Sequence, residues 1–278
     1  MHFSILAFAV LLFFCLNSLP DGKLHVYVLD VGQGDSILIQ TPFDERVLID
    51  GGPDNKVIEQ LSKVMPFYEK EIDLVILTHP DADHVNGLVD VLKRYHVKAV
   101  MMTGLTQFSS DYNAFLNQVS QRNTPVFFVG NKNDFRFGNV VFDILFPMSS
   151  LQGTTFVKSN NSSIAFRLMY GKNIFYFSGD MEAEKEFELV NSNLDLRTDF
   201  LKVSHHGSNT SSTGIFLDKL KPRFAAISCG VNNKFHHPHP VTIENLQKRG
   251  IRIYRTDLDG IIEAVSDAKE IQFKTWGK

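Results

Sequence analysis

The chain contains little cysteine and no strong excess of charge, and both shortages restrict its function. Among the 278 residues only Cys15 and Cys229 are cysteines, and Cys15 lies in an apolar N-terminal segment. The remaining body therefore cannot form an internal disulfide, and cysteine usage does not indicate a compartment. The formal net charge of −3 provides no overall signature of nucleic-acid binding.

Long hydrophobic runs, repeats and linkers are also scarce. The one long apolar run, Phe3–Leu16, is shorter than the roughly 20 residues of a transmembrane helix and lacks the positively charged start of a signal peptide. A buried core helix is disfavoured because the run has no polar outer face. We expect residues 1–22 to act as a signal peptide or membrane anchor, so that the chain is membrane-associated or exported, with a cytoplasmic location as the alternative. Residues 23–278 would form one catalytic domain.

Histidine, by contrast, is concentrated in short clusters. The segment Thr78–His84 reads Thr-His-Pro-Asp-Ala-Asp-His and directly follows the apolar run Leu74–Leu77. Its imidazoles and carboxylates are ligands for zinc, manganese or iron. A polar turn is the alternative, because Pro-Asp is ordinary turn chemistry. The density of metal-binding side chains favours a metal site.

Two further clusters follow apolar runs. Asp180 comes after Asn173–Phe177, and by itself is better explained as the cap of the helix that follows. His205 and His206 come after Leu201–Val203, and one of them should face away, because neighbours on a strand point to opposite faces. Capping does not explain three strand ends that carry histidine and aspartate. Together they favour a metal site.

Apolar β-rich runs alternate with helical patterns along the chain. We expect helices at Lys56–Val64, Asn86–Arg94, Tyr112–Gln121, Ala183–Val190, Gly214–Lys219 and Val241–Lys248. Two halves, each with strands followed by helices, would stack as helix, sheet, sheet and helix. The pattern predicts an α/β protein with a four-layer αββα sandwich and the three clusters along one sheet edge.

These motifs, in this order, resemble the metallo-β-lactamase-fold hydrolases, and specifically the C-terminal domain of ComEC-type competence (DNA-uptake) proteins. The resemblance covers nearly the whole chain after residue 23 and rests on the segments Leu29–Ser36, Leu48–Gly52, His79–His84, Asn160–Ser163, Ser178–Asp180, Lys202–Ser208, His237–Pro240 and Arg255–Asp257. It implies the metallo-β-lactamase fold, which agrees with the αββα prediction.

The resemblance also implies two divalent metal ions, manganese or zinc. The implied ligands are His79, Asp81, Asp83, His84, Asp180 and His205, with His206 as the alternative to His205. The usual third histidine of the first metal is missing, and Asn161 or Ser162 occupies that stretch. In the loop His79–His84, Asp81 stands where most of the superfamily has the second histidine of a His-x-His pair, which disfavours a β-lactamase. The many carboxylates shift the preference toward manganese.

We expect a metal-activated water to be the nucleophile. The expected catalytic residues are Asp83, His206 and His239. The expected substrate-binding residues are Lys202, Ser208, Asn161 and His237. The alternative for His239 is that its His-Pro-His-Pro segment merely leads into a helix.

Charge is uneven along the chain. Residues 197–255 contain ten Lys or Arg but three Asp or Glu, which suits a cationic rim around a phosphodiester-cleaving site. Solvated helix ends are the alternative reading. The resemblance to ComEC-type proteins implies a metal-dependent nuclease that acts on DNA and is linked to DNA uptake or degradation. The alternatives are a phosphodiesterase or esterase for a small or cell-surface phosphorylated substrate, and a non-catalytic DNA-binding module.

Overall fold

The computed structural model describes residues 20–130 and 134–277. The expectation for Phe3–Leu16, and for nearly all of residues 1–22, lies outside these residues. Within the described part, no helix is both long enough and apolar enough to cross a membrane.

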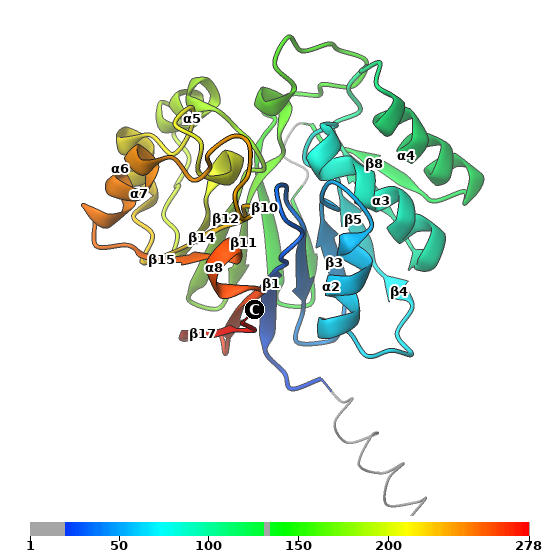
Figure 1. The fold of residues 1–278 in the computed structure, drawn as a ribbon, viewed down its shortest axis with the longest axis horizontal. Helices are drawn as coiled ribbons and strands as arrows, with labels where there is room; N and C mark the ends of the chain where they lie inside the picture. The colour runs from blue at the N-terminus through cyan, green and yellow to red at the C-terminus, as the bar shows by residue number, and fades with distance from the viewer. Residues whose placement is uncertain (1–19, 131–133, 278) are drawn as a thin grey trace, which may run out of the picture.

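Two large sheets face each other at the centre of the molecule (Figure 1). Within the described residues the first has eight strands, in the order β17-β16-β1-β2-β3-β5-β7-β8, and the second has seven, in the order β15-β14-β13-β12-β11-β10-β9. The strands of the first sheet are β1 (Leu24–Val28), β2 (Ile37–Gln40), β3 (Arg46–Ile49), β5 (Leu74–Ile76), β7 (Val100–Met102), β8 (Val126–Phe128), β16 (Ile262–Ser266) and β17 (Ile271–Thr275). Those of the second are β9 (Phe135–Phe137), β10 (Val140–Phe146), β11 (Ala165–Tyr170), β12 (Asn173–Phe177), β13 (Phe200–Lys202), β14 (Phe224–Ile227) and β15 (Arg252–Arg255).

Helices cover the outer face of each sheet (Figure 1). The first sheet carries α2 (Lys56–Val64), α3 (Ala82–Arg94) and α4 (Ser110–Gln121), and the second carries α5 (Ala183–Val190), α6 (Gly214–Leu220) and α7 (Pro240–Gln247). The remaining short elements are α8 (Thr256–Asp259), the 3-10 helices η1 (Ser159–Ser162) and η2 (Ser204–Gly207), and the small sheet of β4 (Glu71–Ile72) and β6 (His96–Val97).

Three separate hydrophobic cores hold these layers together. In β1, the side chains of Val26 and Val28 enter the core between the sheets, while Tyr27 packs into the core under α2 and α3. This alternation follows the period of two in a strand. A third core lies between the second sheet and its helices and includes Phe216 and Leu246. The four-layer αββα prediction is confirmed.

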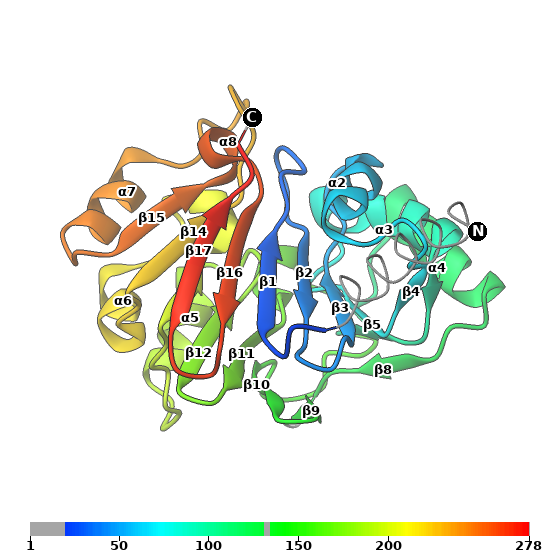
Figure 2. The same ribbon diagram turned by 90° about the horizontal axis from the view of Figure 1, so that it is seen from below.

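The end of the chain departs from the predicted order of two halves, each with strands followed by helices. The last two strands return to the first sheet, where β16 pairs antiparallel with β1 and β17 forms the edge (Figure 2). Ile271 and Phe273 of β17 both pack on the central core. Without this hairpin, β1 would be an exposed edge strand.

The parallel strands decide where the site lies. Strands β3, β5 and β7 are parallel in the first sheet, and β12 to β15 are parallel in the second. Loops that follow parallel strands emerge at the same edge of a sheet, which is where such folds place their ligands. The histidine and aspartate clusters follow β5, β12 and β13 at this edge.

Candidate metal centre

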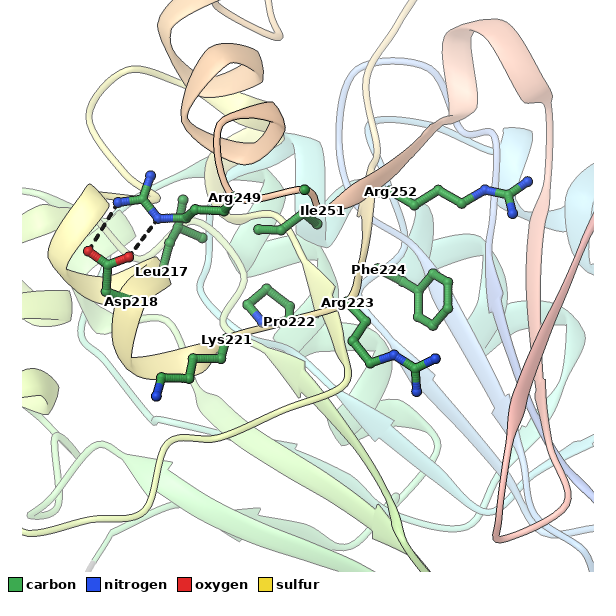
Figure 3. A pocket seen from close by; sticks show the side chains of 10 residues that line it. Leu217, Asp218, Lys221, Pro222, Arg223, Phe224, Arg249, Ile251 and Arg252 are labelled. Carbon is green, nitrogen blue, oxygen red and sulfur yellow. Dashed lines mark hydrogen bonds and ion pairs between the residues drawn. The ribbon is translucent and has the colours of Figure 1, made fainter.

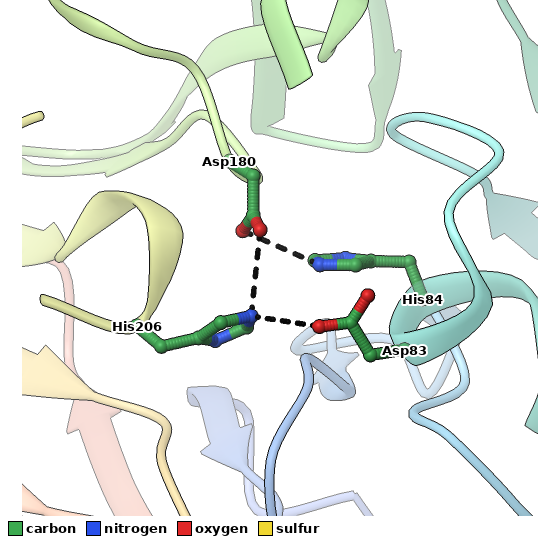
Figure 4. Close-up of side chains that lie close together, drawn as sticks. All are labelled: Asp83, His84, Asp180 and His206. Atoms are coloured by element: carbon green, nitrogen blue, oxygen red, sulfur yellow. Dashed lines mark ion pairs between the residues drawn. The ribbon is translucent and has the colours of Figure 1, made fainter. Parts of the chain in front are cut away.

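Four side chains from three separate segments meet at this edge: Asp83, His84, Asp180 and His206 (Figure 4). One possible ligand atom from each lies within 4.8 Å of the others. The Nε2 of His84 lies 3.3 Å from Oδ1 of Asp180, and the Nε2 of His206 lies 3.4 Å from both Asp180 Oδ2 and Asp83 Oδ2. The group joins the two halves of the sandwich.

Asp83 and His84 lie in a helix and not in a loop. Helix α3 begins at Ala82, ahead of the predicted start at Asn86, so both side chains belong to its first turn. Glycine lets this helix lie directly on backbone, since a Cβ on Gly87 would lie 1.9 Å from the Gly51 carbonyl oxygen. The Gly51 N–H donates to the His84 carbonyl at 2.7 Å. The close approach therefore fixes the position of the metal-binding turn.

Asp180 is not a helix cap. The N-cap residue of α5 is Glu182, and the Asp180 side chain instead reaches His84 and His206 with 4 % of its surface exposed. The backbone N–H of Asp180 donates to the Ser163 hydroxyl at 3.1 Å. The capping alternative is therefore excluded, and the carboxylate is free to bind a cation.

The order of preference between His205 and His206 is reversed. Both residues lie in η2 with left-handed φ angles of 49° and 54°, and not on a strand. His206 is buried among the carboxylates, whereas the Nε2 of His205 lies 3.8 Å from Asp180 Oδ2 and 3.5 Å from Asn160 Nδ2, with 21 % of the side chain exposed. The alternation of side chains along a strand could not predict that His206 is the buried ring, because the two residues lie in a left-handed turn and not in a strand. Such strained residues concentrate at functional sites.

His79 and Asp81 lie beside this group. The Nε2 of His79 is 3.7 Å from Asp81 Oδ2, and the ring centroids of His79 and His84 are 4.1 Å apart. The Gln107 side-chain amide donates to Asp81 Oδ1 at 3.5 Å, and 31 % of the Asp81 side chain is exposed. His79 and Asp81 therefore form a pair of possible ligands next to the four-residue group.

Hydrogen bonds fix which nitrogen each imidazole turns inward. His84 Nδ1 donates to Asp50 Oδ2 at 2.9 Å, and His206 Nδ1 donates to the Ser228 carbonyl at 3.1 Å. Thr78 Oγ1 donates its proton to Asp50 Oδ2, so His79 Nδ1 donates to Thr78 Oγ1 at 3.1 Å. Donation through Nδ1 leaves each Nε2 to act as a metal ligand.

The inward-facing atoms lack hydrogen bonds. Within the described residues, the buried atoms His79 Nε2, His84 Nε2, His206 Nε2 and Asp180 Oδ1 have no hydrogen-bond partner. Unsatisfied buried polar atoms are costly and rare, so a gathering of four needs an explanation. A divalent cation satisfies imidazole nitrogens and carboxylate oxygens together. The residues fit a metal centre.

The electrostatics agree with this fit. Burial by itself lowers the pKa of His84 and His206, but the surrounding carboxylates outweigh it and hold both pKa values well above the usual range. Burial raises the pKa of Asp180, but the two imidazoliums hold it well below its usual value. The carboxylates thus favour positive charge within this group of residues, whether as protons on histidine or as a metal cation.

Asp50 supports the centre from behind. It is fully buried, and its carboxylate accepts from the backbone N–H of Thr78 at 2.8 Å, from the Thr78 hydroxyl and from His84 Nδ1. Its own φ of 56° is left-handed. Asp50 thus holds the ring of His84 and the Thr78 backbone in place behind the centre.

Lys202 does not contact substrate, which corrects the expectation for this residue. Its side chain is 1 % exposed, and its ammonium donates to Asp35 Oδ2 at 2.7 Å and to the Val203 carbonyl at 3.0 Å. Strand β13 turns Lys202 inward between the sheets. A bound nucleic acid therefore cannot reach it.

Ser208 and Asn161 also form hydrogen bonds within the protein. Ser208 is buried, and its hydroxyl oxygen accepts from the backbone N–H of Thr210 at 3.2 Å. The Asn161 amide donates to Glu184 Oε2 and accepts from the backbone N–H of Glu182. Neither side chain is open to substrate, so both expectations are corrected. It is the neighbouring Asn160 that contacts His205.

His237 and His239 do lie beside the centre. The His237 ring centroid is 6.2 Å from that of His206 and 5.5 Å from that of His205, while His239 lies 4.9 Å from His237. Burial and the neighbouring charge on His206 lower the pKa of His237 to about 4. His239 is the N-cap residue of α7 without a side-chain cap, and its Nδ1 accepts from the Asn209 N–H at 3.0 Å. Its role in catalysis stays a prediction.

Sequence reasoning overlooked Gln33 as a functional residue. Its side-chain oxygen accepts from the backbone N–H of Gly230 at 3.2 Å, and its amide donates to His237 Nδ1 at 3.4 Å. Gln33 thus ties the β1–β2 loop to the loop that carries His237. Its place between Gly32 and Gly34 in the Leu29–Ser36 motif was the available signal.

The positive stretch does not form a rim around the centre. Several of its cations line a pocket of about 760 Å³ at the beginnings of β14 and β15, whereas the metal centre follows the strand ends (Figure 3). Lys221 is the C-cap residue of α6, and Arg249, just beyond α7, pairs with Asp218. Cations are favourable at helix C-termini, so the helix-end alternative accounts for these residues. Arg255 likewise pairs with Asp257.

Comparison with known proteins agrees with this fold and centre. A curated relative, ComE operon protein 3 of Bacillus subtilis, is 32 % identical over 274 residues, which is 92 % of this chain and 34 % of the relative. Competence protein ComA of Neisseria gonorrhoeae is 27 % identical over 252 residues, 89 % of this chain and 33 % of the relative. The chain thus spans about a third of the length of these relatives.

Solved structures with little sequence identity share the fold. CmlA, a diiron beta-hydroxylase from Streptomyces venezuelae, superimposes with a TM-score of 0.53 at 13 % identity, covering 89 % of this chain and 54 % of CmlA. Igni18, a metallo hydrolase from the archaeon Ignicoccus hospitalis, gives 0.52 at 11 % identity over 91 % and 99 % of the two chains. The sequence model of the Metallo-beta-lactamase superfamily matches residues 29–231. This chain therefore belongs to the metallo-β-lactamase superfamily.

Proposed function

We propose that this chain is a metal-dependent phosphodiesterase that cleaves DNA. The observation that carries the proposal is the cluster of Asp83, His84, Asp180 and His206, in which the buried atoms His84 Nε2, His206 Nε2 and Asp180 Oδ1 have no hydrogen-bond partner. In a hydrolase superfamily, that arrangement is best explained as a centre for divalent cations. When bound, such cations supply a nucleophilic hydroxide at neutral pH and stabilise the charge that develops on a phosphoryl group.

The ligand set suggests how two cations would be held. His84, His206 and Asp83 would hold one, and His79 with Asp81 would hold the other. Asp180 would join the first, because its two oxygens lie 3.3 Å from His84 Nε2 and 3.4 Å from His206 Nε2. Three carboxylates among six ligands favour manganese over zinc, because oxygen ligands suit the harder ion.

The chain's own groups would position the phosphodiester. His237 and His239 lie on the loop beside the centre, where either could donate a proton to the leaving oxygen or a hydrogen bond to a phosphate oxygen. Gln33 keeps His237 in place through Nδ1. With Nδ1 engaged as an acceptor, neutral His237 carries its proton on Nε2 and can act as a donor.

DNA is proposed as the substrate because of the relatives. ComE operon protein 3 and Competence protein ComA match most of this chain, and Recombination protein 2 of Haemophilus influenzae is 27 % identical over 96 % of it. The resemblance to ComEC-type DNA-uptake proteins implies contact with a nucleic-acid strand. A small or cell-surface phosphodiester is the competing substrate, and binding without cleavage is the competing role.

The test compares substrates on one preparation. Protein loaded with manganese or zinc is incubated with labelled single-stranded DNA, double-stranded DNA and bis-p-nitrophenyl phosphate. We expect DNA cleavage that is faster with manganese and is lost in the Asp180→Ala variant. Hydrolysis of the small diester with intact DNA would establish the competing substrate. DNA binding with neither substrate cleaved would establish a non-catalytic module.

We further propose that residues 1–22 bring the chain to a membrane, on account of the unbroken apolar run Phe3–Leu16. Cells that express the full chain are fractionated beside cells that express a version starting at Gly22. We expect the full chain in the membrane or exported fraction. Equal amounts of both versions in the soluble cytoplasmic fraction would reject this role.

A further inference from the structure

An exposed aromatic side chain stands next to the metal centre. Phe235 lies on the loop between β14 and α7 and is 47 % exposed. Its ring stacks on His237 with centroids 5.7 Å apart and an interplanar angle of 23°, and the His237 ring lies 6.2 Å from that of His206. The phenyl ring is thus separated from a metal-binding histidine by a single imidazole.

The loop holds Phe235 on an ordered framework. The Asn233 amide donates to the carbonyls of Gly230 and His237 at 2.9 and 2.6 Å, and its oxygen accepts from the His237 N–H at 2.9 Å. Gln33 joins the same loop to the first sheet. These bonds fix the residues on both sides of Phe235, so its exposure does not come from a loose loop.

A cation accompanies the ring. The Lys234 ammonium lies 4.9 Å from the Phe235 ring centroid, and Lys234 is exposed. Within the described residues no ion pair involves Lys234, in contrast to Lys202, Arg249 and Arg255. An exposed cation–π contact is weaker than the stacking of a base, so a base can displace the ammonium and leave it to meet a phosphate.

We propose that Phe235 stacks a nucleobase of a single-stranded nucleic acid and that Lys234 contacts a phosphate of the same strand. This inference rests on the proposed function and specifies the form of its substrate. An aromatic ring beside a cation is the combination that binds single strands without sequence preference, because every base has a π-face. A base within a duplex is covered by its neighbours, so the platform favours unpaired strands.

The test measures binding of the full chain with a chelator present, so that the strand stays intact. The probe is a single-stranded oligonucleotide with one 2-aminopurine, whose fluorescence is quenched on stacking. We expect wild type to quench it, and Phe235→Ala to lose the quenching and bind at least about fivefold more weakly. Phe235→Trp should restore both. Phe67→Ala removes another exposed ring, 81 % exposed in the turn after α2, and should bind like wild type.

An oligonucleotide of abasic sugar-phosphate separates stacking from charge. Phe235→Ala should bind this probe as wild type does. Lys234→Gln should weaken the binding of both probes and reduce the salt dependence of that binding. Equal 2-aminopurine binding and quenching by wild type and Phe235→Ala overturns the platform, as does a wild type that does not bind the probe. Cleavage of DNA by the manganese-loaded wild type tests the proposed function separately. If the manganese-loaded wild type cleaves DNA but the Phe235→Ala variant binds and quenches normally, only this inference is rejected, and the proposed function stands.

Discussion

Lys202 and Asp35 form an ion pair that joins β13 of the second sheet to the β1–β2 loop of the first, with Nζ 2.7 Å from Oδ2 and both side chains 1 % exposed. The other carboxylate oxygen of Asp35 lies 3.3 Å from His206 Nδ1. Burial raises the pKa of Asp35, but Lys202 and His206 outweigh it and lower the pKa to about 2. One carboxylate therefore connects the sandwich interior to the metal centre.

Removal of the lysine should destabilise the fold. We expect Lys202→Met to lower the free energy of unfolding by about 3–5 kcal/mol, because it leaves the Asp35 charge buried without its main partner. Urea denaturation measures the loss. Lys219→Met, on the exposed face of α6, should change it by less than about 0.5 kcal/mol. A double-mutant cycle with Asp35→Asn should show strong coupling, and additive effects would contradict the ion pair.

Asp50 should control metal affinity without touching the metal. Its carboxylate fixes His84 with Nε2 inward, so Asp50→Asn should weaken binding of manganese or zinc by about 10- to 100-fold. Competition with a chelator measures the affinity. Asp54→Asn, an exposed neighbour in the same loop, is the matched control and should bind metal as wild type does. Unchanged affinity in Asp50→Asn would show that His84 needs no support.

The two candidate ligands Asp180 and Asp81 should differ in importance. Asp180 lies within 3.4 Å of both His84 and His206, whereas Asp81 lies 3.7 Å from His79 alone and is partly exposed. We expect Asp180→Ala to lose more bound metal and more hydrolysis than Asp81→Ala. Metal analysis by mass spectrometry and hydrolysis of bis-p-nitrophenyl phosphate provide the two measurements. A full metal content in Asp180→Ala would reject the centre as described.

His25 should make stability depend on pH far from the metal centre. Burial lowers its pKa, but hydrogen bonds to Glu263 and Asp21 outweigh this and raise it above 6.5. Burial raises the pKa of Glu263, but chiefly the His25 hydrogen bond lowers it below 4.5. A raised histidine pKa stabilises the folded state below pH 6.5 and loses that effect as pH rises through the folded value; a lowered glutamate pKa stabilises above pH 4.5 and loses it on acidification.

The stabilising effect of His25 should therefore be largest between about pH 4.5 and 6.5. We expect the difference in unfolding free energy between wild type and His25→Gln to peak in this window and to shrink toward pH 9. Urea denaturation at several pH values provides the curve. His96→Gln, which removes an exposed histidine of β6, should give a flat difference. A His25→Gln difference that grows toward alkaline pH would contradict the assignment.

The sequence by itself determined the layers and the chemical character of the centre. Period-two alternation in strands such as β1 sends Val26 one way and Tyr27 the other, and that local pattern is sufficient to require cores on both faces of a sheet. The residue types that follow β5, β12 and β13 can likewise be read directly from the sequence. Imidazoles and carboxylates gathered at one edge could be foreseen because parallel strands end together.

Only the tertiary structure decided which side chains face the candidate metal centre and which are buried elsewhere. His206 replaced His205 because a left-handed turn, held by the Gly179 carbonyl and by Ser208, aims the rings in a way that strand alternation does not describe. Lys202 has a structural role because its partner Asp35 lies 167 residues away, in the loop that leads into β2 of the other sheet. Contacts between segments far apart in the sequence leave no periodic signal, so the roles of such residues depend on how the two sheets meet.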